Sequence, residues 1–224
     1  MEFLEAAVHH VLHARGLYPK ELFETRAVFG ARAQKARHPD LEAYIEGAVH
    51  ALRAPIGRGD VKRVVLVIKD GDAGGTGSPV ERFTFDFLLN DAYLRNAGKV
   101  TRRDIEALTR RFAECISKIT FLDGILPPLP SGASGCTFEI VAYATREGLS
   151  QELGSEAWSE ERVGGTTGGA QLTGGGGGRG GGGRGTGHFE PSLEFSRDCP
   201  RAVYAVKSWQ TNLINLDMFV EKRG

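Results

Sequence analysis

The chain has 224 residues, and its 28 lysines and arginines are balanced by 28 aspartates and glutamates, so its formal net charge is zero. This balance argues against a protein that holds nucleic acid through its own electrostatic field, because phosphate binding requires a surplus of basic side chains. Of the 31 glycines, 15 lie within residues 164–187, and the chain outside that stretch is long enough for one domain with a sizeable core.

The cysteines and the N-terminal residues bear on the compartment. Cys115, Cys136 and Cys199 are odd in number and include no CxxC pair, so we expect buried free thiols rather than a disulfide framework or a zinc site. Glutamates and histidines interrupt any apolar core in the first 16 residues, which argues against a signal peptide. The longest strictly apolar run, residues 64–68, falls far short of the roughly 20 residues of a membrane span. The sequence predicts a soluble nuclear or cytosolic protein.

Two helices are expected in the first quarter of the chain. Apolar residues at helical spacing predict a helix over Phe3–Arg15, and a second over Pro39–Arg53, where proline suits the first turn. The stripe of the first helix consists of Leu4, Val8, Val11 and Leu12. Between the two helices the sequence predicts only a turn at Pro19.

A β-hairpin is expected next. The β-branched run Val61–Ile68 predicts a buried strand, and residues 80–87 alternate between a polar side and a mostly aromatic side. Residues 71–77 could suggest a phosphate-binding loop, but no lysine follows Gly77 and Pro79 stands where a helix would begin. A flexible hairpin tip is favoured.

The strongest helical pattern spans Thr101–Leu122, where Thr101 and Asp104 resemble a capping box. Its expected buried stripe is Ile105, Leu108, Phe112, Cys115, Ile116, Ile119 and Leu122. Strands are expected at Cys136–Thr145, Ala202–Ser208 and Leu213–Glu221. The order helix, helix, hairpin, helix, strand, irregular arm and two strands predicts an α+β fold with an antiparallel sheet packed on about three helices, not a Rossmann fold.

Candidate chemical sites are weak. His9 and His13 have the spacing of zinc-binding helices, but no glutamate lies between them and no third ligand is apparent, so we interpret them and His10 as lying on a solvated helix face. The glycine tract holds two arginines and no aromatic residue, which favours a disordered loop insertion over an RNA-binding arm. No nucleophile with a recognisable base appears. We therefore expect no enzymatic activity, no metal and no cofactor.

Two aromatic residues are candidates for binding. Tyr44 lies on the apolar stripe of the second helix, where packing in the core and contact with a partner both remain open. Trp158 stands alone in a polar, weakly patterned arm, where a large aromatic side chain commonly docks a partner or anchors the arm.

Five segments, in this order, resemble the HORMA-domain accessory subunit of translesion DNA polymerase zeta, the mitotic-arrest-deficient-like protein B family. The segments are EFLEAAVHHVLHARGLYP, HPDLEAYIEGAVHALR, VKRVVLVI followed by PVERFTF, GCTFEIVAYATRE, and LINLDMFVEK. The resemblance implies one HORMA domain over residues 1–224, with a safety-belt arm at residues 146–201 that contains a disordered Gly-rich insertion at residues 164–187. Members of the family usually have an additional turn or more before the first helix of this chain.

The resemblance also implies a function. Such a protein is a nuclear, non-catalytic adaptor that clamps a peptide of the polymerase zeta catalytic subunit and bridges it to the C-terminal domain of a Y-family polymerase in DNA-damage tolerance. It contacts neither nucleic acid directly nor membranes. The alternative is a spindle-checkpoint HORMA protein that inhibits the anaphase-promoting complex.

Site residues follow from the same resemblance. Tyr44 and Trp158 match positions that pack on the trapped peptide, and Leu41, one helical turn before Tyr44, is expected to line the same pocket. A second-partner surface is implied at Ala202, Asp217 and Phe219, where the family has Leu, Gln and Tyr. Arg110 or Arg111 lies near an arginine that the family uses for HORMA homodimers or heterodimers.

Overall fold

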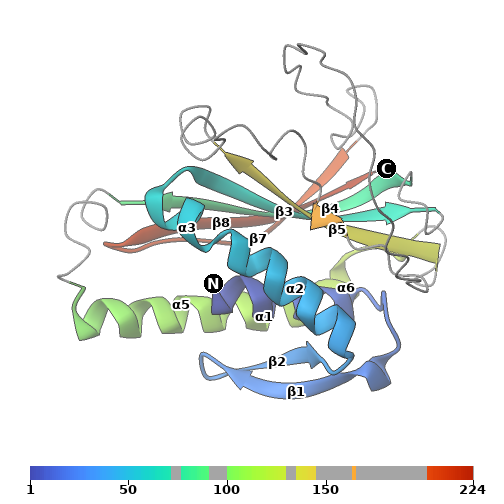
Figure 1. Cartoon of the computed structure of the whole chain (residues 1–224), viewed down its shortest axis with the longest axis horizontal. Helices are drawn as coiled ribbons and strands as arrows, with labels where there is room; N and C mark the ends of the chain where they lie inside the picture. The colour runs from blue at the N-terminus through green and yellow to red at the C-terminus, as the bar shows by residue number, and fades with distance from the viewer. Residues whose placement is uncertain (72–76, 91–99, 130–134, 145–162, 165–200, 224) are drawn as a thin grey trace, which may run out of the picture.

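The computed structural model describes residues 1–71, 77–90, 100–129, 135–144, 163–164 and 201–223, and Figure 1 shows their arrangement. The helices are α1 (Glu2–Ala14), α2 (Pro39–Ala51), α3 (Arg53–Arg58), α5 (Arg102–Thr120) and α6 (Leu122–Ile125), with a 3-10 turn at Lys20–Leu22. The strands are β1 (Phe23–Val28), β2 (Ala31–Ala36), β3 (Val61–Asp70), β4 (Ser78–Leu89), β5 (Cys136–Ala144), β6 (Val163–Gly164), β7 (Arg201–Gln210) and β8 (Ile214–Arg223).

Two antiparallel sheets organise these elements. The larger has the order β6-β5-β3-β4-β8-β7, and α1, α2 and α5 lie along one side of it, which we call the helix-facing side (Figure 1). The smaller sheet, β1–β2, lies beyond α1 on the same side. β3 lies between β4 and β5 in the larger sheet, and residues 64–68 of its β-branched run are all buried, so the strand is covered on both faces. The predicted α+β fold is confirmed.

The path of the chain links opposite sides of the larger sheet. β5 ends at Ala144 on one side of the β3–β4 pair. The C-terminal hairpin β7–β8 pairs with β4 on the other side, over nine residue pairs from Glu81↔Lys222 to Leu89↔Ile214. Residues 145–200, most of the predicted arm, therefore connect the two sides of the sheet.

Helix α5 confirms the predicted cap and corrects part of the predicted stripe. The amide of Asp104 donates to the Thr101 hydroxyl at 3.2 Å, and the Thr101 amide donates back to the Asp104 carboxylate at 3.0 Å. Cys115, Ile116 and Ile119 are buried as expected. Ile105 was expected in the core but is 54% exposed, because the first turns of α5 extend past α1 (Figure 1).

The β1–β2 hairpin was not predicted. Its loop residues, Phe29 and Gly30, both have positive φ, 54° and 83°, as in a type I′ turn. The Phe29 ring lies 5.2 Å from that of Phe112 on α5. This packing stabilises a phenylalanine at a turn position with positive φ, which bulky residues disfavour.

A search of the helices that the structure describes finds none with the length and apolar composition of a membrane span.

Candidate functional site

Tyr44 lies where α2 meets β5. Its half-buried ring packs edge-on against Phe138 of β5, with ring centroids 5.6 Å apart, and the Tyr18 ring approaches Phe138 at 6.4 Å. Leu41 is only 5% exposed and belongs to the core. Leu41 is therefore inaccessible to a partner in this structure, whereas Tyr44 on the same helix keeps part of its surface exposed.

The edge of β5 opposite β3 is the candidate position for a further strand. One side of β5 pairs with β3 from Asp70↔Cys136 to Val61↔Ala144. On its other side, only Ile140 and Glu139 are paired among the described residues, with the two residues of β6. The remaining backbone groups on that side form the kind of edge to which an extended peptide adds by β-augmentation. We call this edge together with Tyr44 the β5 site.

Several predicted features lie outside the described residues. Trp158 is among them, so the structure does not place it relative to Tyr44. Cys199, the glycine tract after Gly164 and most of the 71–77 hairpin tip also lie outside the described parts of the chain. Cys115 and Cys136 are both buried, as expected, and burial raises the pKa of the Cys115 thiol to about 11.

The predicted second-partner surface is only partly brought together. Asp217 and Phe219 are two residues apart on β8, so both point to the outer face of the sheet, away from the helices. Asp217 is exposed and Phe219 is half-buried. Ala202 stands directly opposite Lys222, whose side chain is buried on the helix-facing side. Ala202 therefore points away from the other two residues.

Val203, which the sequence analysis did not select, lies on the same face of the sheet as Asp217 and Phe219, where Ala202 was expected. It is 64% exposed and follows Ala202 by one residue, so its side chain lies on the outer face. Ala205, two residues further along β7, stands directly opposite Phe219. The alternation of strand residues could have revealed this shift, but only with the β7–β8 register in hand.

The two dimer candidates differ in their surroundings. Arg110 is exposed on α5. Arg111 is half-buried and forms an ion pair of 3.1 Å with Glu114. The hydrogen bond from Lys207 of β7, at 2.9 Å, is the main cause of the lowered pKa of Glu114. Of the two arginines, Arg110 is therefore the more available to a second copy.

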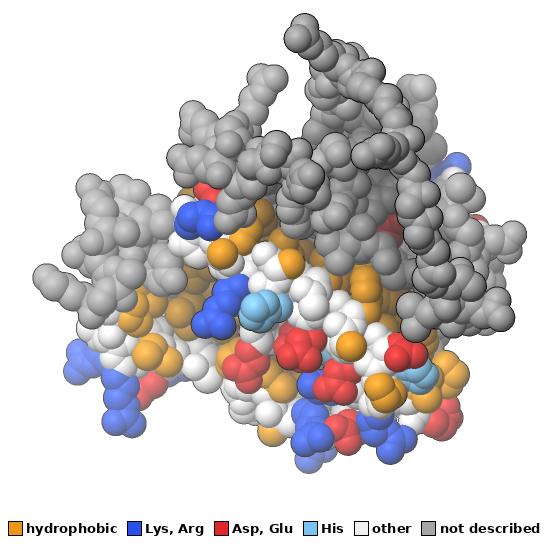
Figure 2. Space-filling model, viewed as in Figure 1, with side chains coloured by type: hydrophobic (Ala, Val, Ile, Leu, Met, Phe, Trp, Pro, Cys, Tyr) orange, Lys and Arg blue, Asp and Glu red, His pale blue; other side chains and the backbone are white. Residues whose placement is uncertain are grey.

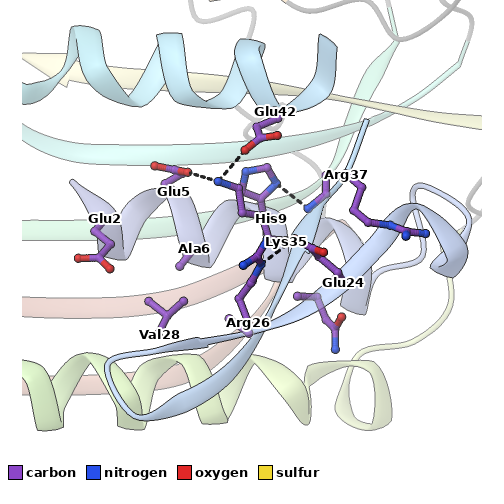
Figure 3. Close-up of a pocket in the computed structure, with 13 residues that line it drawn as sticks. Glu2, Glu5, Ala6, His9, Glu24, Arg26, Val28, Lys35, Arg37 and Glu42 are labelled. Carbon is purple, nitrogen blue, oxygen red and sulfur yellow. Dashed lines mark hydrogen bonds and ion pairs between the residues drawn. The ribbon is translucent and has the colours of Figure 1, made fainter. Parts of the chain in front are cut away.

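A separate cavity of about 520 Å³ lies between α1, α2 and the β1–β2 hairpin (Figure 3). Its charged side chains pair mainly with one another, and Lys35 lies 2.7 Å from Glu42 and 3.3 Å from Glu5. The described residues contain no group of three or more His, Cys, Asp or Glu that could hold a metal ion.

The interpretation of the α1 histidines as solvated is wrong for two of them. His9 is fully buried at the cavity wall, and its Nδ1 accepts the Ala36 amide at 3.4 Å (Figure 3). His10 is 4% exposed, and its Nδ1 accepts the Gln34 amide at 3.1 Å. Burial is the main cause that lowers the pKa of each imidazole from 6.5 to about 4. The unpredicted β1–β2 hairpin is what covers them.

Comparison with known proteins agrees with this geometry. A model of the HORMA domain matches residues 1–144. The chain is 34% identical over 152 residues to chicken "Mitotic spindle assembly checkpoint protein MAD2B", covering 68% of this chain and 66% of the relative. It is 32% identical over 143 residues to an Arabidopsis thaliana "DNA polymerase zeta processivity subunit", covering 64% and 60%. The chain thus matches just under two thirds of the length of these relatives.

Among solved structures, a chain of the crystal structure of the mitotic checkpoint complex matches with a TM-score of 0.66. That match covers 100% of this chain and 96% of the other at 20% identity, so it supports the fold alone. The resemblance to the MAD2B proteins is confirmed by the relatives. The matched domain, the antiparallel sheet with its helices on one side, and the C-terminal hairpin beside β4 together show that the chain belongs to the HORMA-domain family.

Proposed function

We propose that this protein is a peptide-clamping adaptor and a non-catalytic subunit of DNA polymerase zeta. The observation that carries the proposal is the topology of the sheet. The C-terminal hairpin occupies the β4 side, and among the described residues only β6 pairs with the outer edge of β5, which Tyr44 borders and which we assign to an extended ligand. The plant relative that is named as a polymerase zeta processivity subunit supports the choice of partner.

In this mechanism the peptide of the catalytic subunit adds to β5 as a strand. Backbone hydrogen bonds supply affinity, and Tyr44 packs on the side chains of the peptide. Residues 145–200 connect β5 with the hairpin on the far side of the sheet, and in our proposal this segment closes over the bound peptide. Release then requires rearrangement of the protein, and affinity is governed mainly by the dissociation rate.

Tyr44→Ala is expected to weaken capture of such a peptide by about 2 kcal/mol or more, roughly 30-fold, while the fold stays intact. Trp158→Ala is expected to have an effect of the same size. Titration calorimetry with the peptide measures both. Glu46→Ala, on the exposed side of the same helix, is the control and should bind normally. Normal capture by Tyr44→Ala or Trp158→Ala would show that the site is wrongly assigned.

A pull-down from nuclear extract with the wild type and Trp158→Ala separates the two candidate functions. Recovery of a B-family polymerase subunit that is lost in the variant supports the adaptor. Recovery of components of the anaphase-promoting complex would support the alternative, a spindle-checkpoint protein. The MAD2B relatives are named as mitotic spindle assembly checkpoint proteins, which supports the alternative.

The outer face of the C-terminal hairpin is our proposed contact for the C-terminal domain of a Y-family polymerase. Asp217 and Phe219 lie there with Val203, whereas Ala202 does not. Val203→Glu should weaken that contact at least tenfold, about 1.4 kcal/mol, without changing peptide capture. Ala202→Glu is the matched control on the same strand. Loss of the contact in Ala202→Glu but not in Val203→Glu would reverse the assignment.

We further propose that the protein acts in the nucleus, pairs with a second HORMA domain near Arg110, and reaches DNA only through its partners. Acidic and basic side chains are interspersed over α2 and the β1–β2 hairpin in Figure 2, with no large basic patch on that face. This mixed surface and the zero net charge favour protein partners over direct binding of nucleic acid or of an anionic membrane surface.

A further inference from the structure

A buried cluster of charges joins the C-terminal strand to the body of the domain. Glu81 of β4 is fully buried on the helix-facing side of the sheet. The Arg15 guanidinium, at the end of α1, donates one hydrogen bond of 2.8 Å to each oxygen of its carboxylate. Lys222 of β8 donates to the same carboxylate at 2.9 Å. Two cations therefore share one buried carboxylate.

Backbone carbonyls after α6 contact both cations, and Arg15 also lies 3.5 Å from the exposed carboxylate of Asp123 in α6. The Pro127 carbonyl accepts from Arg15 at 2.8 Å and from Lys222 at 2.7 Å, and the Pro128 carbonyl accepts from Lys222 at 3.1 Å. The three N–H groups of Lys222 thus have three acceptors, which is the full capacity of an ammonium group. The three contacts fix the orientation of the Lys222 side chain, and the Glu81 carboxylate offsets its charge.

The cluster lies at the end of the pairing that holds the hairpin. Glu81 and Lys222 stand opposite each other in the β4–β8 ladder, at the end furthest from the β7–β8 turn. Detaching β8 from this end requires that Lys222 leave one carboxylate and two carbonyls together, inside a site that excludes water. Ends of strands open more readily than their middles, so an anchor placed here opposes the first step of detachment.

We propose that Arg15, Glu81 and Lys222 form a latch that keeps the β7–β8 hairpin on β4, and that Lys222 sets how often the hairpin detaches. The consequence for peptide release rests on the proposed function, in which the β7–β8 hairpin is joined to one end of the segment that encloses the peptide. Detachment of the hairpin is then a route for peptide release, and the latch lengthens the time that the peptide stays bound.

Hydrogen exchange of the full chain without peptide tests the latch. Lys222→Met keeps most of the side-chain length but removes the ammonium. Amides of residues 214–223 should exchange at least tenfold faster than in the wild type, while those of β3 and α1 keep their rates. Lys207→Met is the matched control, since Lys207 lies on the same hairpin and pairs with Glu114 at a half-exposed position. Unchanged exchange in Lys222→Met, or equal acceleration throughout the chain, would overturn the proposal.

A second measurement follows the dissociation of the bound peptide by fluorescence. Lys222→Met should release it at least tenfold faster. Faster exchange in β8 with unchanged release would reject the role of the latch in release. If the wild type binds no such peptide, the proposed function fails, whereas the exchange result still decides whether the latch exists.

Discussion

Glu81→Ala is expected to lower the free energy of unfolding by about 3 to 5 kcal/mol, because it removes the buried carboxylate that Arg15 and Lys222 share. The Asp123 carboxylate that remains 3.5 Å from Arg15 is 69% exposed and replaces little of this interaction. The side chains of Arg15 and Glu81 are 2% and 0% exposed, so bulk water does not screen this pair, and a water molecule that enters the vacated space brings no negative charge. Lys222 loses the same carboxylate. Urea denaturation followed by circular dichroism measures the loss.

The same strand supplies a matched control for this variant. Asp86 of β4 also holds an arginine through two hydrogen bonds, to Arg63 at 2.6 and 2.8 Å. These side chains are 30% and 46% exposed, so Asp86→Ala should cost less than about 1 kcal/mol. Similar losses for the two variants would show that burial does not distinguish the two pairs.

Acidification from pH 7 to pH 5 is expected to lower the free energy of unfolding by about 3 to 4 kcal/mol through His9 and His10 together. The folded protein holds the pKa of each imidazole near 4, whereas the unfolded chain takes up protons from about pH 6.5. The stabilisation is therefore complete above pH 6.5 and is lost as the pH falls from 6.5 to 4. Denaturation curves across this range measure it.

Single variants assign this pH dependence to the histidines. His10→Gln should remove about half of the loss, because glutamine can still bond to the Gln34 amide but does not take up a proton. His50→Gln replaces an exposed histidine of α2 and should leave the pH dependence unchanged. An identical pH dependence in His10→Gln would mean that the loss arises from other groups.

Sequence patterns predicted the elements that carry strong periodicity. Helices α1, α2 and α5 and the β3–β4 hairpin agree with the predictions because each has an apolar stripe that faces one core. The β1–β2 hairpin was missed because its strands, FETRAV and ARAQKA, are polar and its Phe29–Gly30 turn lacks the usual Asn-Gly signal. Helix α3 was missed because Pro55 and Gly57 lie within its six residues.

The candidate site was predictable by residue but not by geometry. Tyr44 could be singled out on its helix, yet only the fold shows that it meets Phe138 of β5. Ala202 and Val203 differ by one position in sequence, and the register of β7 against β8 decides which face each one occupies. The burial of His9 and His10 depends on a hairpin that periodicity does not reveal. Long-range pairing was the missing information in each case.

The pairing of β4 with β8 has a consequence for biosynthesis. Residues 1–144, which match the HORMA domain, leave the ribosome before β8 at residues 214–223 exists. The 69 residues between Ala144 and Ile214 take roughly 3 to 14 s to translate at typical rates. During that interval the backbone of β4 has no partner on one side, and such an exposed strand invites pairing with other nascent chains. A chaperone that covers β4 during this interval would raise the yield of folded protein.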